Sequence, residues 1–69
     1  MNNNISKLAV IEDGAIIGKD VTIAPFCLIS AESTIGDGTT IAQGTCIYGK
    51  TTIGKNNKIF SYAVLGSDP

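Results

Sequence analysis

The sequence has 69 residues, a net charge of −1, no histidine and 43% hydrophobic residues. A chain of this length forms at most one small domain, so a two-domain enzyme is excluded. Because the chain has no histidine, acid-base catalysis and metal binding by histidine are excluded within it. Its net charge shows no excess of basic residues of the kind that binding to nucleic acid requires.

The chain also lacks signals for a membrane or for bound cofactors. No apolar run reaches the roughly 20 residues of a membrane span or the roughly 7–15 of a signal core, so we expect no membrane span and a cytoplasmic location. Cys27 and Cys46 stand without a CxxC motif or histidine partners, which predicts free thiols, no metal site and no cofactor.

An aliphatic residue recurs at every sixth position from residue 5 to residue 65 without a change of register. The eleven residues are Ile5, Ile11, Ile17, Ile23, Ile29, Ile35, Ile41, Ile47, Ile53, Ile59 and Leu65. A helix would require apolar spacings of three and four, whereas a period of six suits short strands interrupted by corners. The pattern predicts a repeat protein whose unit is a hexapeptide.

Each hexapeptide divides into a strand and a corner when the aliphatic residue is counted as position 1. Positions 5 and 1 share parity and both point inward, and position 6 points outward between them. Positions 2 to 4 then form the corner, and position 4 holds residues that tolerate positive φ. Those residues are Gly14, Asp20, Gly38, Gly44, Asn56 and Asp68.

A second period of 18 residues joins three hexapeptides into one coil, as the repeated pairs at residues 17–18, 35–36 and 53–54 indicate. The sequence therefore predicts an all-β triangular solenoid of about three and a half coils over residues 5–69, filled by isoleucine stacks. Asn57 falls at an inward position, where we expect its amide to be satisfied at a corner or in an asparagine ladder.

The outward sixth positions form one column on each face of the predicted prism. Only one column is apolar throughout, and it consists of Val10, Leu28, Cys46 and Val64. An exposed apolar stripe on a small domain usually marks an interface, so these four residues are the candidate subunit interface. Phe26, Phe60 and Tyr62 lie at one corner and border the same contact. The alternative is a wall that downstream chain covers.

The cysteines and the acidic residues are interpreted as structural residues and not as functional ones. Cys27 and Cys46 leave opposite sides of the wall, which excludes a bridge between them. The acidic residues lie at corners, where we expect solvated side chains without a partner that shifts their pKa. The five of the six acidic residues considered in this way are Asp13, Asp20, Glu32, Asp37 and Asp68.

The repeat resembles that of the hexapeptide-repeat acyltransferases, and the resemblance implies a left-handed parallel β-helix. The left hand comes from the resemblance alone, because the general rule for parallel crossovers predicts a right hand. Within this group the segments 23–27, 47–54 and 57–63 resemble the opening coils of the UDP-N-acetylglucosamine O-acyltransferase family.

That family implies transfer of a hydroxyacyl group from acyl carrier protein to UDP-N-acetylglucosamine at the start of lipid A synthesis. It also implies a homotrimer with a catalytic histidine between subunits. This sequence has no histidine, so no catalytic residue is carried over and the chain alone is expected to be inactive. We interpret it as an N-terminal, non-catalytic part of such an enzyme.

Two other interpretations remain open from the residues. One is a self-standing β-solenoid that assembles through its apolar face or its coil ends. The other is part of a sugar or amino-acid acetyltransferase with the same repeat. An ice-binding solenoid is disfavoured, because segments 22–24, 40–42 and 52–54 lack the second threonine of a Thr-x-Thr pair.

Overall fold

Eleven two-residue β-strands recur along the chain, one in each hexapeptide, in a computed structural model that describes residues 3–66. Every strand consists of an outward position 6 and the aliphatic position 1, as the repeat predicts. The strands are β1 (Asn4–Ile5), β2 (Val10–Ile11), β3 (Ile16–Ile17), β4 (Thr22–Ile23), β5 (Leu28–Ile29), β6 (Thr34–Ile35), β7 (Thr40–Ile41), β8 (Cys46–Ile47), β9 (Thr52–Ile53), β10 (Lys58–Ile59) and β11 (Val64–Leu65).

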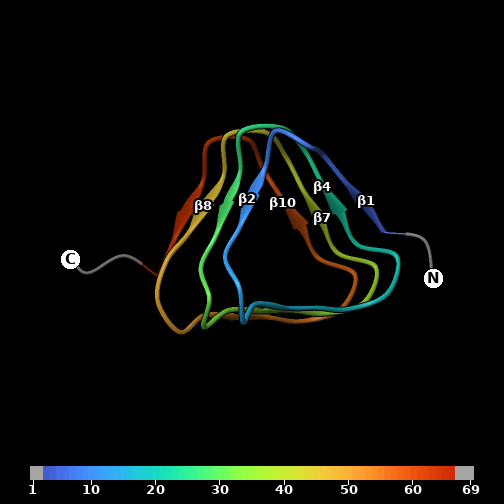
Figure 1. Ribbon diagram of the computed structural model, residues 1–69. Helices are drawn as coiled ribbons and strands as arrows, with labels where there is room; N and C mark the ends of the chain where they lie inside the picture. The colour runs from blue at the N-terminus through green and yellow to red at the C-terminus, as the bar shows by residue number, and fades with distance from the viewer. Residues whose placement is uncertain (1–2, 67–69) are drawn as a thin grey trace.

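The strands form three parallel sheets, one on each side of a triangular prism (Figure 1). Sheet A has the order β1-β4-β7-β10, sheet B the order β11-β8-β5-β2, and sheet C the order β3-β6-β9. Each residue pairs with the residue 18 positions along, as Ile5 does with Ile23 and Ile23 with Ile41. Three hexapeptides therefore make one coil.

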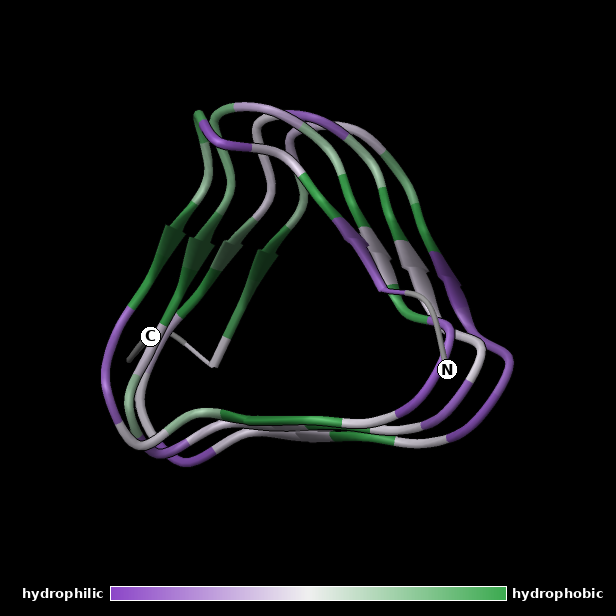
Figure 2. Ribbon diagram, turned by 45° about the vertical axis from the view of Figure 1, so that its right-hand side comes forward, coloured by the Kyte–Doolittle hydropathy of each residue, from purple (hydrophilic) through white to green (hydrophobic). Residues whose placement is uncertain are grey.

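The coils wind in a left-handed sense. In Figure 2 the N-terminal end faces the viewer, and the chain runs anticlockwise from β1 over the upper corner to β2 while later coils lie deeper. The expected left-handed parallel β-helix is thus confirmed.

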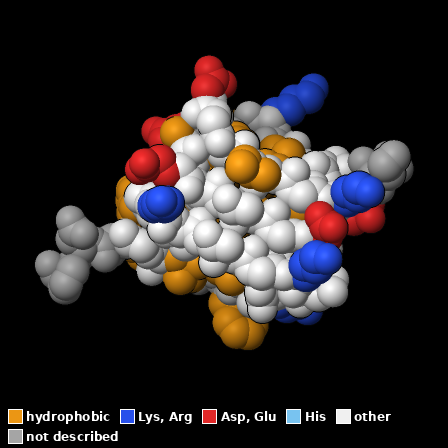
Figure 3. Space-filling view, turned by 90° about the horizontal axis from the view of Figure 1, so that it is seen from below, with side chains coloured by type: hydrophobic (Ala, Val, Ile, Leu, Met, Phe, Trp, Pro, Cys, Tyr) orange, Lys and Arg blue, Asp and Glu red, His pale blue; other side chains and the backbone are white. Residues whose placement is uncertain are grey.

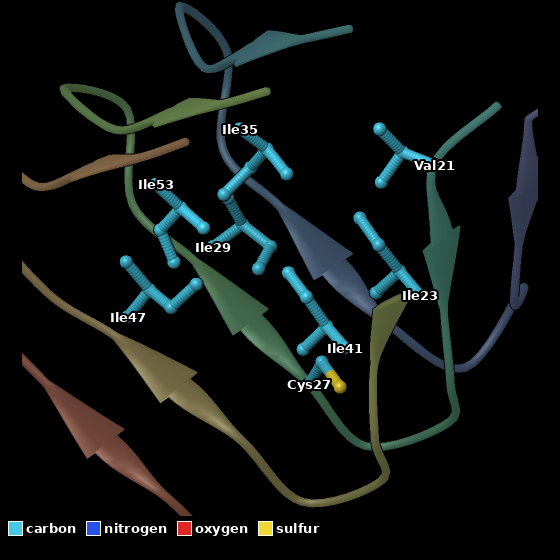
Figure 4. Packing of buried hydrophobic residues seen from close by; sticks show 8 residues of the cluster. All are labelled: Val21, Ile23, Cys27, Ile29, Ile35, Ile41, Ile47 and Ile53. Atoms are coloured by element: carbon cyan, nitrogen blue, oxygen red, sulfur yellow. The ribbon is translucent and has the colours of Figure 1, made fainter. Parts of the chain in front are cut away.

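The core is a set of isoleucines in the middle coils. Ile29, Ile41 and Ile47 are fully buried, and the side chains of the cluster converge on the axis of the prism (Figure 4). The buried hydrophobic residues are Val21, Ile23, Cys27, Ile29, Ile35, Ile41, Ile47 and Ile53. Removing such surface from water contributes about 1.5–3 kcal/mol for each large side chain.

Several side chains at the inward position 5 form hydrogen bonds that the repeat alone did not predict. Thr39 Oγ1 donates to the carbonyl of Gly54 at 2.7 Å, Thr45 Oγ1 donates to Phe60 at 3.0 Å, and Cys27 Sγ donates to Ala42 at 3.1 Å. Each bond reaches the corner of the next coil. Within residues 3–66 no buried side-chain polar atom lacks a partner, so hydrogen bonds offset the cost of removing these polar groups from water.

Position 4 adopts positive φ at the predicted corner residues that the structure describes, with φ of 105° at Gly14 and 56° at both Asp20 and Asn56. Phe26 and Tyr62 also have positive φ, 65° and 60°, which their residue types did not predict. Asp68, which was assigned to the same position, lies outside the described residues.

Two expectations about the interior require correction. The isoleucine stack is not buried over its whole length, because Ile5 is 38% exposed and Ile59 only partly buried near the ends of the described coils. Asn57 is exposed and forms no asparagine ladder, since the column contains Thr39 and Val21. Its backbone N–H donates instead to Thr39 Oγ1 at 3.4 Å.

Candidate interaction surface

The outer face of sheet B carries the apolar column Val10, Leu28, Cys46 and Val64. The parallel register stacks these residues directly, with Val10 opposite Leu28, Leu28 opposite Cys46, and Cys46 opposite Val64. Val10 is 57% and Val64 56% exposed, whereas Leu28 and Cys46 are partly buried between them. Figure 2 shows the strands of sheet B as the hydrophobic side of the prism.

The other two faces are more polar. Sheet A presents Asn4, Thr22, Thr40 and Lys58 on its outside, and its strands are pale or hydrophilic in Figure 2. Sheet C presents Ile16, Thr34 and Thr52. In the view from below, hydrophobic side chains appear as separate groups among backbone and other uncharged side chains, with charged side chains towards the edges (Figure 3).

The corner between sheets A and B adds a second exposed apolar feature, which we call the aromatic corner. Exposure is 60% for Leu8, 69% for Phe26, 76% for Phe60 and 71% for Tyr62. The sequence had placed Phe26, Phe60 and Tyr62 together but had missed Leu8, which the 18-residue period could have supplied. Tyr48 lies at the corner between sheets B and C. All four aromatic residues of the chain therefore lie at one of the two corners that border sheet B.

Tyr62 is held in place by two contacts. Gln43 Nε2 donates to the Tyr62 hydroxyl at 3.3 Å, and the ring lies over Gly44, where an added Cβ would overlap the ring carbons. Gly44 thus leaves the space that the tyrosine of the next coil fills.

Tyr48 and Cys46 form a polar pair beside the apolar column. A hydrogen bond that the Tyr48 phenol donates to the Cys46 sulfur raises the pKa of the phenol above its ordinary value of 10.0, and Coulombic repulsion from the same side chain adds to the rise. The neutral phenol is therefore the favoured form, and Tyr48 remains uncharged across the physiological range.

Replacing Cys46 by alanine should lower the pKa of Tyr48 towards 10.0 because the hydrogen bond is lost. Spectroscopic titration of tyrosinate in a Tyr62→Phe background, where Tyr48 is the single tyrosine, measures this directly. The Tyr62→Phe chain with Cys46 intact is the control. An unchanged Tyr48 pKa after the substitution would show that the thiol does not contact the phenol.

The remaining candidate groups are structural. Cys27 is buried and Cys46 partly exposed, and both are free thiols on opposite sides of the wall, as predicted. Asp37 is not a free corner carboxylate, because its Oδ1 accepts a 2.8 Å hydrogen bond from the backbone N–H of Lys19. The Ala31 backbone N–H likewise donates to Glu12 Oε1 at 3.0 Å.

Within residues 3–66 the structure contains no pocket and no group of three or more potential metal ligands. The same residues form no helix that could cross a membrane.

These observations define a left-handed β-solenoid of hexapeptide repeats with one apolar side. No family model matches the chain. Its sequence is nevertheless 63% identical over 65 residues to the acyl-(acyl-carrier-protein)–UDP-N-acetylglucosamine O-acyltransferase of Bartonella tribocorum, covering 94% of this chain and 24% of that protein. The same enzyme of Mesorhizobium japonicum is 42% identical over 69 residues, covering 100% of this chain and 25% of the relative.

A solved structure gives the same relationship. The UDP-N-acetylglucosamine acyltransferase from Campylobacter jejuni superposes with a TM-score of 0.94 at 42% identity, covering 96% of this chain and 26% of that one. The chain is therefore homologous to one segment of the UDP-N-acetylglucosamine O-acyltransferases, which confirms the resemblance. It spans about a quarter of the length of these relatives.

Proposed function

We propose that this chain is the N-terminal β-helix portion of an acyltransferase that moves a hydroxyacyl group from acyl carrier protein to UDP-N-acetylglucosamine. The reaction belongs to lipid A synthesis in the cytoplasm. The similarity to acyltransferases named for these substrates, over 94–100% of the chain, carries the proposal.

Within that enzyme we assign these coils a supporting role and no catalytic residue. Their backbone is organised to template further coils, because the N–H groups of one coil donate to carbonyls of the next. Examples are Thr22 to Thr39 and Thr40 to Asn57. A further coil would extend this ladder, because its backbone groups would pair with those that the last coil leaves unpaired.

We further propose that sheet B is a subunit interface of a homotrimer and that the apolar column lies in it. Its support is the uninterrupted column of apolar side chains on one face.

A double lysine variant tests this interface. Leu28→Lys with Val64→Lys would place two charges in a desolvated contact, so we expect the trimer to dissociate. The matched control is Thr34→Lys with Thr52→Lys, which adds the same charge to the outer face of sheet C. Light scattering coupled to size exclusion reports the mass of each, and circular dichroism confirms folding. A trimer that survives in the sheet B variant would contradict the proposal.

A chimaera tests the function itself. Residues 4–66 of this chain replace the equivalent coils in the Campylobacter jejuni acyltransferase, and transfer of a hydroxyacyl group from acyl carrier protein to UDP-N-acetylglucosamine is measured. We expect activity of the same order as the parent, and none from the 69-residue chain by itself. A chimaera that folds and assembles but does not transfer would contradict the proposed function and favour the self-standing assembly module.

A further inference from the structure

Two corners of the solenoid contain an aspartate followed by a glycine, Asp13 with Gly14 and Asp37 with Gly38. Each aspartate stands at position 3 of its hexapeptide and each glycine at position 4, and φ is 105° at Gly14 and 74° at Gly38. In such a pair the glycine nitrogen can attack the carboxyl carbon of the aspartate, because glycine has no side chain that obstructs the approach. The two pairs share this chemistry and differ in what surrounds them.

The pair Asp37 and Gly38 is held by backbone groups of both neighbouring coils. Asp37 Oδ1 accepts a hydrogen bond from the Lys19 N–H at 2.8 Å, and the Gly38 N–H donates to the Lys19 carbonyl at 2.8 Å. On the other side the Asp37 carbonyl accepts a hydrogen bond from the Asn56 N–H, also at 2.8 Å. The carboxyl group that would be attacked and the nitrogen that would attack are therefore both engaged.

The pair Asp13 and Gly14 has none of these contacts within residues 3–66. It lies in the first coil, and no described coil precedes it, so the Gly14 N–H finds no carbonyl to which it could donate. Within the same residues the Asp13 carboxylate has no hydrogen bond and no ion pair. Asp13 and Gly14 are exposed, whereas Asp37 and Gly38 are half-buried. Both reacting groups are therefore free at the first corner and open to water.

We propose that Asp13 is a site of spontaneous isomerisation to isoaspartate in the folded chain and that Asp37 is protected from it. The Gly14 nitrogen bonds to Asp13 Cγ, its proton and a carboxyl hydroxyl leave together as water, and a five-membered succinimide ring forms. Water then opens the ring in one of two ways. Cleavage of the new bond to Cγ restores aspartate, and cleavage of the original peptide bond leaves the main chain running through Cβ and Cγ as isoaspartate.

The fold selects between the two aspartates through hydrogen bonds. Ring formation requires the glycine nitrogen to turn towards the side chain, and at Asp37 this movement breaks contacts with both neighbouring coils, so the reaction there needs a local opening. At Asp13 no contact among the described residues opposes it. We expect Asp13 to react roughly tenfold faster or more, as the loss of two or three hydrogen bonds implies. The product adds a methylene group to the main chain of the corner between β2 and β3.

Peptide mapping after incubation of the folded chain at neutral pH measures both sites at once. Cleavage after lysine releases residues 8–19 with Asp13 and residues 20–50 with Asp37. An isoaspartyl peptide has the mass of its parent and a different retention time in chromatography, and electron-transfer fragmentation identifies the altered residue. Incubation in concentrated urea is the control for effects of local sequence. Asp13→Glu, which cannot form the five-membered ring, is the control for the assignment to Asp13.

In the folded chain isoaspartate should accumulate at Asp13 roughly tenfold faster or more than at Asp37, and in urea the two rates should converge. Equal rates in the folded chain would overturn the proposal. A difference of the same size in urea would overturn it as well, because the fold would then not be its cause. Circular dichroism confirms that the chain is folded, and the acyltransferase chimaera with residues 4–66 is mapped in its place should the isolated chain fold poorly.

Discussion

Replacing Ile41 by alanine is expected to lower the free energy of unfolding by about 2–5 kcal/mol. Ile41 is completely buried and pairs with Ile23 and Ile59 in the central coils of sheet A. The substitution removes apolar contacts and leaves a cavity that the closely packed coils cannot fill. Small domains are stable by only about 5–15 kcal/mol, so much of the stability is lost. Urea unfolding followed by circular dichroism measures the change.

Ile59→Ala is the matched control for this prediction. Ile59 occupies the same position in the same sheet one coil later, but it is only partly buried. Its removal costs less transfer free energy and leaves no closed cavity, so the loss should be clearly smaller. Equal losses for the two variants would contradict a core centred on the middle coils.

Gly36→Ala is the second substitution with a large expected effect. A Cβ at Gly36 would lie 2.5 Å from the carbonyl carbon of Gly54 and 2.8 Å from the backbone nitrogen of Lys55. Both atoms belong to the backbone of the next coil, so the two coils must separate at this corner. We expect a loss of about 1–3 kcal/mol, the range of overpacked sites.

Gly54→Ala provides the comparison for Gly36→Ala, since it stands one coil later at the same corner. The nearest atom to a Cβ there is Asn57 Nδ2 at 3.4 Å, an ordinary contact. The change in free energy of unfolding should stay within about 1 kcal/mol. If Gly36→Ala were equally harmless, the close approach of the coils at this corner would be wrong.

The hexapeptide period predicted the fold almost completely, because every unit repeats the same local rule. A two-residue strand ends at each aliphatic residue, and the corner residues Gly14, Asp20 and Gly38 adopt the positive φ that their types allow. The left hand of the coil did not follow from the period and came from the resemblance.

Features that depend on position in the stack could not be predicted from a repeating pattern. Ile5 and Ile41 are equivalent in the repeat, but only Ile41 has a coil on both sides and is fully buried. Asn57 is exposed in the last described coil for the same reason. The positive φ of Phe26 and Tyr62 opposes their residue preference and matches the φ of Gly14, Asp20 and Asn56 at the same position of other units.

The stacking of the apolar column was predicted from the sequence, and its role as an interface stays a prediction. The apolar column follows from the 18-residue period, because the register that stacks Leu28 on Cys46 is the same one that aligns the isoleucines. The contribution of Tyr48 was missed, since its contact with Cys46 links positions 6 and 2 of neighbouring hexapeptides.

The most direct test of this account is the mass of the chain in solution, measured by light scattering coupled to size exclusion over a range of concentrations. The account predicts a folded, β-rich species that approaches three times the chain mass of 7.1 kDa as concentration rises. A folded species that stays at 7.1 kDa at every concentration would contradict the assignment of sheet B as a subunit interface.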